Sequence, residues 1–246
     1  FRAVGGAGGG VGGEGCRMAS HDLDIYDDVE VFETHPELLH DTPSRRDGID
    51  EETECMLRIY GCELIQECGI LLRCHQTAMA TGQIIFHRFY FRQSMKKCDV
   101  RAVAKAALLL STKIEEQPRP ASDILNVFHA SQQFRRGAKI SPLEAGTARY
   151  YELKQELLDA ESAILRELGF VIHAEHAHKF VLYYIRVLYG KTDFHPDLAQ
   201  KSWNYVNDSY RTLLCVRFRP NVLACGAIFL ASRDLGIALP KGWWGL

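Results

Sequence analysis

Apolar residues recur every three or four positions through most of the chain after residue 50, and strict alternation is rare. This period predicts helices and no strands. The expected helices span residues 52–74, 76–93, 100–116, 122–134, 149–168, 177–189, 196–214 and 220–235. Ser122 or Asp123 would cap the start of the fourth helix, and Gly169 would end the fifth at a C-cap position. The sequence therefore predicts an all-α protein.

The chain before residue 51 lacks this pattern. Residues 1–15 contain eight glycines and almost nothing apolar to bury. Residues 16–50 are acidic and rich in turn-forming residues, so we expect them to be mostly irregular, with a short helix near residues 28–32. Residues 1–50 are thus interpreted as a flexible N-terminal segment that is first glycine-rich and then acidic.

An internal repeat is visible when the sequence is shifted by 120 positions. The third expected helix then aligns with the eighth, and the aligned residues are of the same class, apolar with apolar and small with small. The second expected helix aligns with the seventh. Ala/Leu-rich helices resemble one another, but two helices agreeing at one offset favour a true repeat. We predict one five-helix unit (51–172) and a second unit (173–246) truncated after its third helix. Exposed apolar surface, including Trp243 and Trp244, should make the second unit the weaker half.

Composition narrows the possible functions. The chain has 246 residues, of which 47% are hydrophobic and 24% are charged, as expected for a soluble globular protein. The net charge is −2, with no basic tract of the kind that a nucleic-acid surface needs. No signal peptide or membrane-length apolar run is present. The eight cysteines form no C-x-x-C pair, which indicates free thiols in a reducing compartment.

Two charges stand on otherwise apolar helices. Lys113 lies in LLLSTKIEEQP (108–118), and a lysine near a helix C-terminus is ordinary because it meets the last free carbonyls. Glu161 is less ordinary, because its helical neighbours three and four residues away are all apolar. The two charges either pair with each other or await the backbone of a partner.

Seven short motifs occur in a characteristic order along the chain: FHRFY (86–90), TKIEEQP (112–118), ILNVFH (124–129), LRELGF (165–170), EHAHKF (175–180), WNYVNDS (203–209) and AIFLASR (227–233). Taken together, they resemble the cyclin family, of the transcription type and most like cyclin L. Each motif alone is moderately specific, whereas their order and spacing together are highly specific. The resemblance covers residues 50–240 and implies tandem cyclin boxes, the five-helix units predicted above.

The resemblance implies a non-catalytic regulatory subunit that binds and activates a cyclin-dependent protein kinase. The implied partner is a PITSLRE-type or related kinase of transcription and pre-mRNA splicing, and the implied location is the nucleus. In cyclins, the residues matching Lys113 and Glu161 hydrogen-bond the backbone flanking the kinase αC helix. The same resemblance implies apolar kinase contacts around them, from Ile114, Leu165, Phe170 and Ile172. No cofactor, metal, small-molecule substrate, nucleic acid or membrane is implied.

The chain also departs from the cyclin pattern at two places. Arg58 matches an arginine whose usual partner is an aspartate of the second helix, but His87 occupies that place, which puts the internal ion pair in doubt. The substrate-docking patch of cell-cycle cyclins matches Leu57, Gly61 and Leu64. Because Gly61 lacks a side chain, docking of that kind is not expected.

Other interpretations were weighed against this one. His173, His176 and His178 form an H-x-x-H-x-H cluster, but no complete zinc ligand set accompanies it, so capping and surface roles are expected. A nucleic-acid-binding factor resembling TFIIB, which also has two cyclin-like folds, would need a basic face and usually a zinc ribbon. An all-α enzyme would need a convergent pocket of titratable groups, and the sequence provides none.

Overall fold

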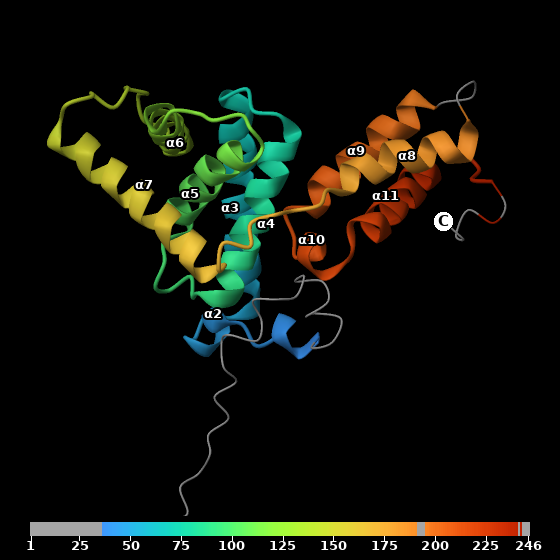
Figure 1. The fold of residues 1–246 in the computed structure, drawn as a ribbon, viewed down its shortest axis with the longest axis horizontal. Coiled ribbons are helices and arrows are strands. Elements are labelled where there is room, and N and C mark those ends of the chain that lie inside the picture. The colour runs from blue at the N-terminus through green and yellow to red at the C-terminus, as the bar shows by residue number, and fades with distance from the viewer. Residues whose placement is uncertain (1–35, 191–194, 241, 243–246) are drawn as a thin grey trace, which may run out of the picture.

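The computed structural model describes residues 36–190, 195–240 and 242, and within these residues the chain is helical without strands. Figure 1 shows the arrangement. The elements are η2 (Pro36–Leu39), α2 (Pro43–Arg46), α3 (Glu51–Leu71), α4 (Gln76–Arg92), α5 (Val100–Ile114), α6 (Ala121–Arg135), α7 (Ala148–Glu167), α8 (Ala177–Tyr189), α9 (Pro196–Ser209), α10 (Leu214–Arg217) and α11 (Pro220–Leu235). The glycine-rich tail, the short helix expected near residues 28–32 and the two C-terminal tryptophans lie outside the described residues. None of the described helices has the length and apolarity needed to cross a bilayer.

The expected helices are confirmed, with ends that agree within three residues except at α9, and two of the differences are informative. Helix α6 begins at Ala121, and its N-cap is Pro120 rather than Ser122 or Asp123, which lie inside the first turn. Helix α9 ends at Ser209 instead of continuing to residue 214. The carbonyl of the next residue, Tyr210, accepts a hydrogen bond from His87 of α4.

The first unit, α3–α7, surrounds α5. This helix is buried on nearly all sides because it is built from small and aliphatic residues, with Ala104, Ala107 and Leu108 inaccessible to solvent. Helix α3 crosses α4 closely at Gly61, where an added Cβ would lie 2.1 Å from the Phe86 ring. A glycine is therefore required at this crossing for steric reasons.

The second unit consists of α8, α9 and α11 with the short α10, and it lies to one side of the first (Figure 1). Its helices follow the predicted repeat: α4 and α9 begin at residues 76 and 196, and α5 and α11 begin at 100 and 220. The described residues contain no counterpart of α6 or α7 in this unit. The predicted arrangement of two helical units, the second truncated after its third long helix, is thus confirmed within the described residues.

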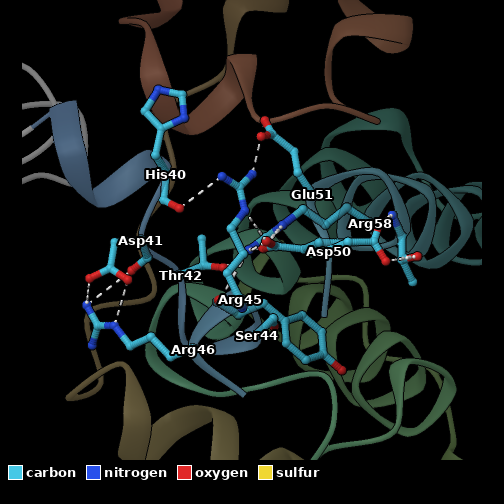
Figure 2. Close-up of polar contacts among 12 residues, drawn as sticks. His40, Asp41, Thr42, Ser44, Arg45, Arg46, Asp50, Glu51 and Arg58 are labelled. Atoms are coloured by element: carbon cyan, nitrogen blue, oxygen red, sulfur yellow. Dashed lines mark hydrogen bonds and ion pairs between the residues drawn. The ribbon is translucent and has the colours of Figure 1, made fainter. Parts of the chain in front are cut away.

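Residues 36–49 form a segment that we call the strap, and it differs from the flexible, irregular chain expected there. Leu39 belongs to the apolar core of the second unit, where it is 7% exposed. Ser44 is fully buried beside the first unit, and its Oγ accepts a hydrogen bond of 3.0 Å from the Met95 backbone N–H. The polar contacts of the strap are drawn in Figure 2. This part of the N-terminal segment is consequently ordered against both units.

Candidate functional site

Lys113 and Glu161 contact each other in the free chain. The Lys113 Nζ lies 2.6 Å from Glu161 Oε1, joining the C-terminal turn of α5 to α7. The lysine side chain is 48% exposed and the carboxylate 11% exposed, because Leu157 and Ile164 bury the glutamate's flanks. Of the two alternatives left open by the sequence, pairing with each other is the one realised in this unpartnered state.

The four apolar candidates differ in their degree of exposure. Ile114, Leu165 and Ile172 are partly buried and pack against the core of the first unit. Phe170 is 67% exposed, although it lies between Leu165 and Ile172 in the chain. Its backbone has a φ of +63°, a left-handed conformation that is uncommon for an aromatic residue. The ion pair is thus flanked by partly covered aliphatic residues, and the turn after α7 presents an exposed aromatic ring.

Arg58 is buried, at 2% exposure, and its partner is a carboxylate that the sequence analysis missed. Its Nη2 and Nε donate to Glu54 Oε1 at 2.7 and 3.0 Å, one turn earlier on α3. Its remaining donors reach the carbonyls of His87 and Tyr90 at 3.3 and 3.2 Å. The internal ion pair therefore exists, but it lies within α3 instead of joining α3 to α4.

Glu54 is held by the strap as well as by Arg58. Its Oε2 accepts hydrogen bonds from the Thr42 hydroxyl at 2.7 Å and from Arg45 Nε at 3.0 Å. Three side chains that Figure 2 labels, Thr42, Arg45 and Arg58, therefore donate to this one carboxylate. Burial works to raise the pKa of Glu54, but Arg58, Thr42 and Arg45 outweigh burial and hold that pKa below its usual value. The carboxylate is therefore ionised and fully satisfied although it is buried.

The signal for Glu54 was available in the sequence, because an acid four residues before an arginine on a helix is a standard pairing distance. The strap contacts had no such signal, since Thr42 and Arg45 lie in a segment without periodicity.

His87 is fully buried and connects the two units. Its Nε2 lies 3.1 Å from the Tyr210 carbonyl, so Nε2 carries the proton and donates to it. Cys62 Sγ lies 3.2 Å from the same nitrogen. Burial first, and the Arg58 guanidinium second, lower the pKa of His87 to about 3. In place of the aspartate usual in cyclins, this position holds a neutral histidine at the interface between units.

The three histidines of the H-x-x-H-x-H cluster do not form a metal site. His176 is the N-cap residue of α8 but makes no capping hydrogen bond with its side chain. His178 is only 3% exposed, so the expectation of a surface role is wrong for it. Its Nε2 contacts Asn207 Oδ1 at 2.8 Å, and its ring lies 4.5 Å from that of Trp203. No group of three or more potential metal ligands occurs among the described residues.

Two of the three positions matching the substrate-docking patch are buried. Leu64 is inaccessible and Gly61 faces Phe86, whereas Leu57 is partly buried and packs against the first core. The missing side chain of Gly61 is therefore not the whole reason, because Leu64 is also withdrawn from the surface.

Comparisons with known proteins agree with this architecture. The family model described as the cyclin N-terminal domain matches residues 30–173, which is more than half of the sequence. The chain therefore belongs to the cyclin family.

Within that family the similarity is to cyclin L proteins. Cyclin-L1-1 of Oryza sativa subsp. japonica is 44% identical over 224 residues, which are 90% of this chain and 51% of that protein. Cyclin-L1 of Homo sapiens is 45% identical over 220 residues, which are 88% of this chain and 41% of that protein. The chain thus spans about half the length of these relatives or less. The predicted resemblance to cyclin L is confirmed.

Among solved structures, the yeast RNA Pol II CTD kinase CTDK-1 complex contains a chain of similar fold. The TM-score is 0.67 at 14% sequence identity, and the match covers 83% of this chain and 62% of that one. At this level of identity, the similarity establishes the fold.

Proposed function

We propose that this chain is the non-catalytic regulatory subunit of a cyclin-dependent protein kinase. The single observation that carries the proposal is the ion pair between Lys113 and Glu161, at the rim of the first unit. Its lysine is half exposed, and the turn after α7, the helix that carries Glu161, leaves the large apolar side chain of Phe170 in solvent. An exposed charge and an exposed apolar side chain presented by neighbouring elements are typical of an interface that awaits a partner.

The proposed docking face consists of Lys113, Glu161, Ile114, Leu165, Phe170 and Ile172. On binding, the two charges would exchange their mutual contact for backbone groups flanking the kinase αC helix. The apolar residues would pack around that contact. We further propose that residues 51–172 form the box that carries this face and that residues 173–246 form the second box.

Activation would follow from differential binding. A kinase of this class is active only when its αC glutamate meets the β3 lysine. A subunit that binds the inward αC conformation shifts that equilibrium, and a shift from 1:99 to 99:1 needs about 5.5 kcal/mol. Removing one partner from a buried charged contact costs about 2–5 kcal/mol. Two such contacts with apolar packing are sufficient for the full shift.

The partner that we propose is a PITSLRE-type or closely related kinase acting in RNA polymerase II transcription and pre-mRNA splicing, in the nucleus. Support comes from the cyclin L relatives, and from the fold shared with a chain of a yeast RNA Pol II CTD kinase complex. The chain itself would perform no chemistry and hold no cofactor.

Charge reversal tests the proposal. A panel of cyclin-dependent kinases is assayed with the wild-type chain, with Lys113→Glu and with Glu161→Lys. We expect the wild type to activate one or two kinases and both variants to lose activation without loss of helicity by circular dichroism. Reversal of Glu152, which pairs with Arg149 in the exposed first turn of α7, is the matched control and should leave activation intact.

The double variant Lys113→Glu/Glu161→Lys separates partner binding from internal stability. It restores the attraction between the two positions but presents reversed charges to the kinase backbone. We expect it to recover thermal stability and to remain unable to activate. Recovery of activation would show that the pair serves only the fold, and normal activation by both single variants would overturn the proposal.

A further inference from the structure

The linker between α7 and α8, residues 168–176, carries part of the proposed docking face across α4 (Figure 1). It leaves α7 through consecutive left-handed residues, Gly169 and Phe170, with φ of +55° and +63°. Beyond the turn, Val171 is 47% exposed. Two exposed apolar side chains on such a turn need outside support to keep one conformation.

The linker has two backbone anchors. Arg88 Nη1 of α4 donates to the His173 carbonyl at 2.8 Å. At the linker's end, the Ala177 N–H donates to the Tyr210 hydroxyl at 3.2 Å, and this contact is buried. These contacts attach the linker to α4 and to α9, but neither reaches the end of α5 where Lys113 lies.

A third anchor does reach the end of α5. Glu115 is the C-cap residue of that helix, two positions after Lys113. Its Oε1 accepts a hydrogen bond of 2.7 Å from the hydroxyl of Thr81, a fully buried residue of α4. His176 Nε2 lies 2.9 Å from the same hydroxyl oxygen and 3.6 Å from Glu115 Oε1.

The donors and acceptors of this trio can be assigned. A hydroxyl has one proton, and Thr81 gives it to the carboxylate, so His176 Nε2 must donate to the Thr81 oxygen. The His176 imidazole is then protonated on Nε2 and neutral. Burial is the largest cause that lowers the pKa of His176, which agrees with this assignment. The trio therefore forms one directed chain of hydrogen bonds from the linker to α5.

We propose that Glu115 is a positioning residue of the docking face. Through Thr81 and His176 it fixes the linker segment that carries Phe170 and Ile172 relative to Lys113 and Ile114. The effect of Glu115 on kinase docking rests on the proposed function, whereas the hydrogen-bonded anchor is a feature of the free chain. Glu116, the next residue, is exposed and makes no contact of this kind, so it provides a matched comparison.

The test uses two disruptive variants, each with a conservative counterpart. Glu115→Ala and Thr81→Val remove the acceptor and the hydroxyl. Glu115→Gln and Thr81→Ser retain them, and Glu116→Ala is the control. Amide hydrogen exchange of the free chain is measured at residues 171 and 177, whose N–H groups are hydrogen-bonded at the two ends of the linker. The affinity for the kinase activated by the wild type is measured in parallel.

We expect Glu115→Ala and Thr81→Val to raise exchange at these amides at least tenfold and to weaken kinase binding about tenfold, equivalent to 1.4 kcal/mol. Glu115→Gln, Thr81→Ser and Glu116→Ala should remain near the wild type. Unchanged exchange in both disruptive variants would overturn the anchor, and faster exchange with unchanged affinity would overturn its role in docking. If no kinase binds the wild type, the proposed function fails, and exchange still decides whether Glu115 holds the linker.

Discussion

At matching positions, the two units use different side chains for the polar contact between their first and second helices. Arg58 of the first unit and His178 of the second lie 120 positions apart, as do His87 and Asn207. In the first unit, a permanent cation pairs with buried Glu54 and reaches the His87 carbonyl. In the second, a histidine contacts the Asn207 side chain, and burial lowers its pKa to about 4. The repeat thus preserves a buried polar contact between its first two helices while replacing a charged group by a neutral one.

The central helices of the two units differ in how completely they are covered. Leu110 of α5 is 5% exposed, whereas Leu230, its counterpart on α11, is 50% exposed. The uncovered side of α11 borders an open groove of about 450 Å³ whose lining includes Phe218 and Val222. Helices α6 and α7 cover α5, and the described residues contain no equivalent pair over α11. Helices of similar sequence are therefore buried to different extents. Equivalent substitutions in them should change the free energy of unfolding by different amounts.

The largest expected effect comes from breaking the charged contact of the first unit. Arg58→Met leaves Glu54 buried without its main cation, and an uncompensated buried charge costs about 3–5 kcal/mol. Urea unfolding followed by circular dichroism measures this loss. The double variant Arg58→Met/Glu54→Gln removes the stranded charge and should recover part of the stability. A loss below about 1 kcal/mol in the single variant would mean that Thr42 and Arg45 suffice to hold the carboxylate.

The next effect compares equivalent leucines on the central helices. Leu110→Ala removes a buried side chain from the first core and should lower the free energy of unfolding by about 2–5 kcal/mol. Leu230→Ala removes a half-exposed side chain and should change it by no more than about 0.5 kcal/mol. Both are read from the same denaturation curves. Equal losses would show that the α11 face is covered in solution, for example by association of two chains, which sedimentation would detect.

The smallest effect depends on pH and concerns His178. Its pKa is about 4 in the folded chain and about 6.5 when unfolded, so between these values the unfolded chain binds more protons. The free energy of unfolding should therefore fall as the pH drops from 6.5 to 4, by up to about 3 kcal/mol from this residue. His87 adds an effect of the same sign. His178→Gln should flatten the acid side of the stability curve, and His40→Gln, at an exposed site, should not. Identical curves for the wild type and His178→Gln would show that His178 does not titrate in this range.

Most of the fold was predictable because helical periodicity and chain-breaking residues are local signals. The starts of α8 and α11 were predicted to the residue, because apolar periodicity resumes at residues 177 and 220. The repeat offset was equally visible. In contrast, the end of α9 was predicted five residues too late, and the bond between His87 and the Tyr210 carbonyl just beyond that end joins residues 123 positions apart, which no local signal indicates.

The residues of the candidate site stay a prediction, and the contact that two of them make in the free chain was left open by the sequence. Lys113 and Glu161 were identified from the apolar character of their helical neighbours, yet their mutual contact depends on how α5 and α7 pack. The anchor at Glu115 had no local signal, because Thr81 and His176 come from two other segments and meet only in the folded chain. Polar contacts between segments that are far apart in the sequence could not be predicted from the sequence alone.

The bond between His87 and Tyr210 also has a consequence for synthesis. A ribosome adds about 5–20 residues per second, so the 123 positions between the two residues take roughly 6–25 s to translate. After residue 172, in the last part of that interval, the completed first unit holds an imidazole N–H on α4 whose acceptor has not been made, beside apolar side chains such as Ile84 that later join the second core. We therefore expect this apolar face of α4 to be exposed transiently during synthesis, and chaperones to bind the nascent chain during that time.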